Sequence, residues 1–127
     1  MVIADVDDAA VAYATVAMTA IDRSTAPPSV ARQAPDPVPA LLIGRLAVDR
    51  RHSGLGVGTA LVAHVLATAV ELNAKAACRA VVVNALHPTA RGWWEHLGFQ
   101  PFEPENERSL DLYLLTADIQ ATLQRML

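Results

Sequence analysis

The spacing of apolar and polar side chains predicts a β-hairpin at the start of the chain. Residues 2–4 and 11–21 are rich in β-branched and small side chains, which suit strands. The acidic run Asp5-Val6-Asp7-Asp8 separates them and has the composition of a turn. We therefore expect two short strands that pair with each other.

A proline-rich segment follows this hairpin. Five prolines fall within a short stretch, at positions 27, 28, 35, 37 and 39. Because proline lacks a backbone donor and has a fixed φ, the segment excludes a continuous helix or a central strand. We expect a loop with one short turn at residues 29–33. The apolar run at residues 41–48, between Pro39 and Asp49, then predicts a buried central strand.

Helical and strand patterns alternate in the second half. Apolar residues recur every three or four positions over residues 56–73, which predicts a helix with one apolar face. Residues 80–86 form another buried-strand run. Pro88 suits the first turn of a short helix at residues 87–96, and Gly98 suits its left-handed cap.

The C-terminal segment predicts one more strand and one more helix. Leucines alternate with other residues over positions 110–114, as on a strand, and residues 118–127 have a short amphipathic helical pattern. The order of elements predicts a mixed α/β layer. It has no internal repeat or linker, so residues 1–127 are expected to form a single domain.

Composition narrows the class of protein. The chain has 127 residues, of which 53% are hydrophobic, and a formal charge of -3, which gives no general attraction to nucleic acid. No apolar run has the roughly 18 residues of a membrane-spanning helix, and the acidic start is unlike a secretory signal. We expect a cytoplasmic protein without a membrane partner. The single cysteine, Cys78, is expected to be a small buried residue, and no metal site is predicted.

The run DRRHSGLGVGTAL, residues 49–61, places three glycines between the central strand and the long helix. Such a turn directs free backbone N–H groups and the positive end of the helix dipole at one point, which suits an anion. Thr59-Ala60 after the last glycine excludes a Walker loop, and the G-x-G-x-G spacing excludes a Rossmann fingerprint. Taken alone, the glycines are also compatible with close packing of loop and helix.

Two blocks of the sequence resemble the GNAT N-acetyltransferases. The segment Ser53-Gly54-Leu55-Gly56-Val57-Gly58 is similar to the family's pyrophosphate loop, Q/R-x-x-G-x-G/A, with Leu46-Ala47-Val48 before it and Leu61 after it. It departs from that pattern at Ser53, where Gln or Arg is typical. The register that starts at Arg51 also satisfies the pattern but misplaces Leu61. The second block, Ala90 to Phe99, resembles the family's A-x-x-F-Y-x-x-x-G-F helix.

The resemblance extends more narrowly to the GNAT-type toxins of bacterial toxin-antitoxin pairs, through the strand, the proline-rich loop and the closing strand and helix. It implies the acyl-CoA N-acyltransferase fold, a mixed and mostly antiparallel sheet flanked by helices. It also implies that the N-terminal helices and first strand of these toxins are absent here. The open edge of the sheet would then be covered by a partner, for example in a homodimer.

The resemblance implies a site for acetyl-CoA, which is a co-substrate. Backbone N–H groups over the glycine loop would hold the pyrophosphate: Ser53, Gly54, Leu55, Gly56, Val57, Gly58 and Thr59. The backbone of Ala47 and Val48 would pair with the pantetheine arm like an added strand. The N–H of Val48 would face the thioester carbonyl as the oxyanion donor.

Trp94 stands where most relatives have the tyrosine that acts as general acid. An indole N–H donates a hydrogen bond but does not titrate, so it does not deliver a proton. Three alternatives follow: the thiolate leaves unprotonated or takes its proton from water, another side chain donates, or the activity is lost. The substitute donors are Tyr13, Tyr113, His87 and His96, each of which is more simply a packing or exposed residue. Glu95 is expected to be a solvated helix charge.

Three functions therefore stay open. The first is a toxin that acetylates the amine of an aminoacyl-tRNA, with a ribbon-helix-helix antitoxin as partner and a local basic rim formed by four arginines: Arg45, Arg50, Arg51 and Arg91. The second is a GNAT enzyme that acts on a small-molecule or protein amine. The third is a module without catalysis that binds acyl-CoA or an antitoxin.

Overall fold

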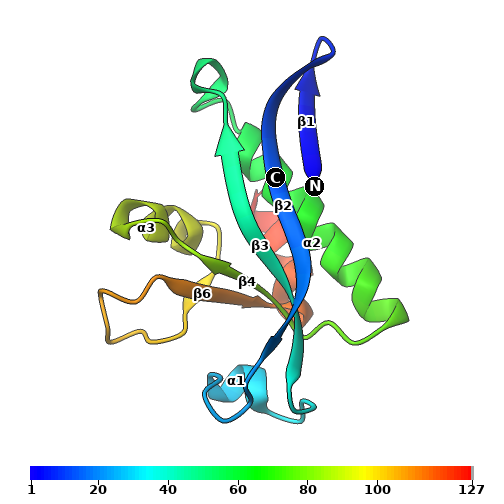
Figure 1. Ribbon diagram of the computed structural model, residues 1–127, viewed down its shortest axis with the longest axis vertical. Coiled ribbons are helices and arrows are strands. Elements are labelled where there is room, and N and C mark those ends of the chain that lie inside the picture. The colour runs from blue at the N-terminus through cyan, green and yellow to red at the C-terminus, as the bar shows by residue number, and fades with distance from the viewer. Residues whose placement is uncertain (127) are drawn as a thin grey trace.

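A computed structural model describes residues 1–126, and these residues form a mixed sheet with helices packed against it (Figure 1). The strands lie in the order β1-β2-β3-β4-β6-β5. Their bounds are β1 Val2–Val6, β2 Ala9–Ile21, β3 Val38–Val48, β4 Ala80–Asn84, β5 Gln100–Pro101 and β6 Asp111–Leu115. The helices are α1 Pro28–Ala31, α2 Val57–Lys75, α3 Pro88–His96 and α4 Ile119–Met126, with single turns η1 Arg50–His52 and η2 Thr116–Asp118.

The strands pair as the expected hairpin and α/β order require. β1 pairs antiparallel with β2, and β2 pairs antiparallel with β3. β3 and β4 are parallel, whereas β4 and β5 each pair antiparallel with β6. The sheet is therefore mixed and mostly antiparallel, as the GNAT resemblance implied. The hairpin turn contains Asp7 and Asp8 with φ of 51° and 64°, a conformation that Asp tolerates better than most residues.

β3 and β4 separate halfway along β3. Their pairing ends at Ile43 and Val83, and β3 then continues for residues 44–48 beside β2 alone. A bulge marks this point, because Thr15 and Val16 of β2 oppose Arg45 and Ile43 and leave Gly44 without a partner. Figure 1 shows the result: β3 continues beside β2, whereas β4 diverges from β3 and leads toward α3.

The main core lies between the sheet and α2, α3 and α4. Buried residues of α2, including Val62, Val65 and Leu66, pack against Leu41 and Ile43 of β3. This is the apolar face that the spacing of residues 56–73 predicts. By length and composition α2 is apolar enough to cross a membrane, contrary to the sequence expectation, although a core helix has the same properties. Here its apolar face covers the sheet.

Arg79 holds the proline-rich segment against the opposite face of the sheet. Its guanidinium donates to three carbonyl oxygens at the end of α1, those of Ser29 at 2.9 Å, Arg32 at 3.0 Å and Val30 at 3.3 Å. The last carbonyl oxygens of a helix have no partner within the helix, and in a helix of four residues these are most of its carbonyl oxygens. The planar guanidinium of Arg79 supplies the missing donors. Val30 and Val38 lie fully buried in this second cluster.

Two details of the sequence expectation were wrong. β3 begins at Val38 and so contains Pro39, which had been assigned to the loop. The Pro39 carbonyl accepts a hydrogen bond from the Arg79 N–H, so it points toward β4. The nitrogen of Pro39 points to the same side, where β3 begins to pair with β4 only at Ala40. No ladder bond is lost. The two-residue strand β5 was not predicted, because it is defined only by pairing with β6.

We expect Arg79→Met to lower the free energy of unfolding by about 2 kcal/mol, because it leaves three carbonyl oxygens without their charged donor. Urea denaturation measures the change. Arg32→Met is the matched control, since the Arg32 side chain is exposed and only its carbonyl takes part. Equal midpoints for the two variants would contradict this role for Arg79.

Candidate functional site

The last five residues of β3 present an open backbone edge inside the sheet. The N–H of Asp49 donates to the Val11 carbonyl of β2 at 2.7 Å. Because backbone groups alternate along an antiparallel strand, Val48 and Leu46 direct their N–H and C=O away from β2, toward the side that β4 has left. Ala47 lies opposite Tyr13 and directs its groups to β2. Val48 is thus placed as the sequence implied, Leu46 joins it, and Ala47 faces the wrong way for pairing with a ligand.

A cavity of about 390 Å³ fills the space between the separated strands. Its walls come from four elements: residues 43–47 of β3, Val83 and Asn84 of β4, Trp93 and Trp94 of α3, and Tyr13 of β2. The lining is mainly apolar, with a backbone edge along one wall. Such a groove suits an extended chain that carries amide groups.

A second cavity, of about 420 Å³, lies against the glycine loop. Six of the predicted loop residues line it: Ser53, Gly54, Gly56, Val57, Gly58 and Thr59. Leu55 does not, and its side chain is exposed. The two cavities share Leu46 and Trp93 as lining residues, so they are neighbours between the loop and the point where β3 and β4 part. Together they are called the groove below.

The loop has the geometry of an anion cradle. Gly54 and Gly56 have φ of 78° and 81°, in the left-handed region that favours glycine. The first hydrogen bond of α2 runs from Ala60 N–H to the Gly56 carbonyl, so the N–H groups of residues 57–59 have no helical partner. They point out of the positive end of a 19-residue helix. The Ser53 N–H differs from the expectation, because it already donates to the Arg50 carbonyl at 3.2 Å.

Gly58 also lies in close contact with its neighbours. A Cβ at this position would lie 3.4 Å from Trp93 and 3.4 Å from Val48. Gly58 therefore lies where α2, α3 and the end of β3 meet, and a methyl group there would be in ordinary contact with both neighbours. Anion binding and packing are both compatible with this glycine.

The turn before the loop is held by Asp49. Its carboxylate accepts the backbone N–H of Arg51 at 2.9 Å, which caps η1. This backbone hydrogen bond lowers the pKa of the Asp49 carboxyl, and the charge of Arg51 acts in the same direction. The carboxylate therefore stays ionised at neutral pH and keeps its cap.

Trp94 is a core residue that also reaches the groove. Its side chain is 6% exposed and packs edge-to-face on Trp93 and Phe99, with ring centroids 4.9 Å and 5.1 Å away. Trp93 is less buried and lines both cavities. The sequence reasoning concentrated on Trp94 and missed Trp93, although its place as the first aromatic of the family's pair was a usable signal.

The other proton-transfer candidates have different surroundings. Tyr113 is buried, its hydroxyl donates to Gln100 Oε1 at 3.1 Å, and it shares a hydrogen bond with Ser29 at 3.1 Å. His87 caps α3, with Nδ1 accepting the Ala90 N–H at 3.1 Å, and His96 is exposed. Only Tyr13 among these candidates lines the groove.

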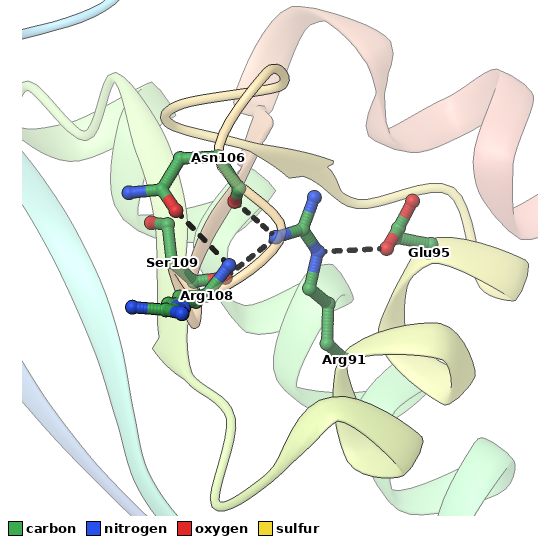
Figure 2. A network of polar contacts seen from close by, with 5 residues as sticks. All are labelled: Arg91, Glu95, Asn106, Arg108 and Ser109. Carbon is green, nitrogen blue, oxygen red and sulfur yellow. Dashed lines mark hydrogen bonds and ion pairs between the residues drawn. The ribbon is translucent and has the colours of Figure 1, made fainter.

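Arg91 does not belong to a basic rim, contrary to the sequence expectation. It is 9% exposed and donates to the carbonyl oxygens of Asn106 at 2.8 Å and Ser109 at 2.7 Å. It also pairs with Glu95 at 3.0 Å, so Glu95 is not simply a solvated charge. Figure 2 shows Arg91 extending from α3 into the loop before β6, where Asn106 also accepts the Arg108 N–H. Arg45, Arg50 and Arg51 remain exposed beside the groove.

Cys78 is buried, and burial raises the pKa of its thiol, so it stays protonated and acts as a small apolar residue. Within residues 1–126 no cluster of three or more His, Cys, Asp or Glu side chains has the arrangement of a metal site.

Comparison with known proteins agrees with this geometry. Residues 1–101 match the acetyltransferase (GNAT) domain. The chain belongs to the GNAT family. A tRNA-acetylating toxin of Mycobacterium tuberculosis (strain ATCC 25618 / H37Rv) is 35% identical over 119 residues, which are 92% of this chain and 69% of that protein.

Solved structures of GNAT toxins have the same fold. AtaT complexed with acetyl-methionyl-tRNAfMet superposes with a TM-score of 0.78 at 29% identity, over 89% of this chain and 66% of AtaT. AtaTR bound with AcCoA gives a TM-score of 0.71 at 27% identity, over 89% of this chain and 62% of that chain. This GNAT chain thus spans about two thirds of the length of these toxins.

We expect Gly56→Ala to weaken acetyl-CoA binding about tenfold, because a Cβ at φ 81° costs about 1–2 kcal/mol in the loop conformation. Isothermal titration calorimetry measures the affinity. Gly92→Ala is the control, since nothing lies within 4 Å of its Cβ position on exposed α3, and it should leave the affinity unchanged. The same loss in both variants would argue against a cradle at the loop.

Proposed function

We propose that this GNAT chain is an acetyl-CoA-dependent N-acetyltransferase of the toxin type, whose acceptor is the amine of an aminoacyl-tRNA. The observation that carries the proposal is the pair of neighbouring cavities, which places an anion cradle beside an open backbone edge. Its similarity to tRNA-acetylating toxins supports the choice of acceptor.

The groove residues fit acetyl-CoA at both ends. The free N–H groups of residues 57–59 and the turn at Gly54 and Gly56 would hold the pyrophosphate. The backbone of Val48 and Leu46 would pair with the amides of the pantetheine arm along the open edge of β3. Trp93 would cover the arm between the two cavities. The bound molecule supplies an acetyl thioester, which an amine attacks at the carbonyl carbon.

The open edge also supplies the oxyanion donor. Negative charge develops on the thioester oxygen during attack, and a fixed backbone N–H facing it stabilises that charge without reorganisation. Val48 remains our proposed donor. Leu46, two residues earlier on β3, offers a second free N–H of the same kind. It lines the same cavity as Trp94.

Proton transfer is assigned to Tyr13. The indole of Trp94 is packed in the core and does not titrate, so the departing thiolate needs another donor. Tyr13 lines this cavity and would give its phenolic proton to the departing thiolate. The neutral amine attacks the acyl carbon, and the proton that its nitrogen then loses would restore the tyrosine.

The acceptor would approach past three exposed arginines. Arg45, Arg50 and Arg51 lie around the groove and offer donors to phosphate oxygens, although the net charge of -3 limits any long-range attraction. The proposal includes a cytoplasmic location, where charged tRNA and acetyl-CoA occur, and a ribbon-helix-helix antitoxin as partner. A homodimer would cover the free edge of β1.

Two alternatives have their own support. An enzyme for small-molecule or protein amines would use the same groove without the arginines. A module that binds acyl-CoA without turnover is favoured by Trp94, because a packed indole occupies the usual position of the acid.

We expect the chain to transfer radiolabelled acetyl from acetyl-CoA to aminoacyl-tRNA. A matched set of acceptors tests this: charged tRNA, uncharged tRNA, the free amino acid and a polyamine. Label on charged tRNA alone supports the proposal. Label on the polyamine or amino acid indicates a small-molecule enzyme, and calorimetric binding of acetyl-CoA without transfer to any acceptor indicates the module.

We expect Tyr13→Phe to lower kcat about 100-fold with little change in KM for acetyl-CoA, because it removes a proton donor and not a binding group. Trp94→Tyr in the same background should recover part of the rate. Tyr113→Phe is the control: it loses the bonds to Gln100 and Ser29 and lowers stability, but leaves kcat of the folded protein unchanged. An unchanged kcat in Tyr13→Phe would overturn the assignment.

A further inference from the structure

A single buried polar atom in the described residues lacks a partner, and it lies beside the glycine loop. Within residues 1–126, Nδ1 of His52 is the one buried side-chain nitrogen or oxygen without a hydrogen bond. His52 ends η1 and lines the same cavity as Gly54, Gly56 and Thr59. An isolated buried polar atom of this kind requires an explanation, because protein interiors pair such groups almost without exception.

The backbone fixes where this ring lies. The His52 N–H donates to the Asp49 carbonyl at 2.9 Å, and the next residue donates to the Arg50 carbonyl at 3.2 Å. Asp49 in turn caps the turn through the Arg51 N–H. The imidazole is therefore held at the rim of the cradle by a turn with three internal hydrogen bonds.

The burial of Nδ1 decides which ring nitrogen carries the proton in the neutral imidazole. A buried N–H without an acceptor costs more than a buried lone pair that stays unprotonated, since the donor loses its hydrogen bond to water entirely. The proton therefore resides on Nε2. This nitrogen is not among the buried unpaired atoms, and it is the donor that the ring would offer to the cavity that His52 lines.

The position of this donor compensates for a departure in the motif. Ser53 stands where GNAT loops usually carry the long side chain of Gln or Arg, and its N–H is already used by Arg50. The residues that line this cavity include no carboxylate that would compete with an anion: Leu46, Val48, His52, Ser53, Gly54, Gly56, Val57, Gly58, Thr59 and Trp93.

We propose that His52 is a phosphate ligand of this protein, donating from Nε2–H to an oxygen of the CoA pyrophosphate in place of the missing side chain at position 53. The inference rests on the proposed acetyl-CoA binding and names a residue for it. The contact is to the pyrophosphate rather than the 3′-phosphate, because the cavity that His52 shares is the one at the start of α2.

Calorimetric titration with three probes tests this proposal. Acetyl-CoA carries all the phosphates, dephospho-CoA lacks the 3′-phosphate, and S-acetyl-pantetheine lacks every phosphate. His52→Ala should weaken acetyl-CoA and dephospho-CoA about tenfold each and leave S-acetyl-pantetheine unchanged. His52→Gln, which places an amide donor near Nε2, should stay within about threefold of the parent. His64→Ala, at an exposed position of α2, is the control and should alter none of the affinities.

The outcomes separate the two proposals. If the parent protein binds none of the probes, the proposed function fails together with the role of His52. If the parent binds acetyl-CoA and His52→Ala binds it equally well, only the role of His52 is wrong. An equal loss for S-acetyl-pantetheine would mean that His52 merely supports the fold. A loss that disappears with dephospho-CoA would overturn the pyrophosphate assignment. His52→Gln keeps the test decisive if His52→Ala unfolds.

Discussion

The separation of β3 from β4 at Gly44 is the constraint on which the whole site depends. A Cβ at Gly44 would lie 2.9 Å from Thr15 Oγ1, so any other residue at this position would require the Thr15 side chain to move. Beyond it, β3 keeps partners on one side only, and a row of backbone donors and acceptors stays open in the middle of a sheet. These groups need partners, from water or from an added chain-like molecule, and in our proposal the pantetheine arm would provide them.

Gly58 lies between the two ends of the groove. Its Cβ position is 3.4 Å from both Val48 of β3 and Trp93 of α3, at the first turn of α2. The cradle for an anion and the open strand edge therefore share a wall. Arg79 and Arg91 satisfy the carbonyl oxygens of the irregular segments around this core. Both guanidinium groups bind carbonyl oxygens of the protein itself, whereas Arg45 of β3 and Arg50 and Arg51 of η1 are exposed.

Local patterns were sufficient to predict most helices and strands but not the residues at which they begin and end. The helix at residues 56–73 and the strands at 41–48 and 80–86 follow from apolar periodicity, which is a property of neighbouring residues, and α2, β3 and β4 confirm them. The entry of Pro39 into β3 depends on where β4 begins to pair, and β5 depends entirely on β6. The burial of Arg91 depends on a loop that lies 15 residues away in the chain.

The sequence by itself determined the family, the expected glycine cradle and the presence of Trp94 in place of the usual tyrosine acid. Motif spacing and residue chemistry are local properties of the chain. Only the tertiary structure decided which backbone groups are free: it directs Val48 and Leu46 to the groove, turns Ala47 to β2 and engages the Ser53 N–H. It also brought Tyr13, Trp93 and His52 to one groove from three different elements. These positions depend on strand register and helix packing, which no spacing along the chain encodes.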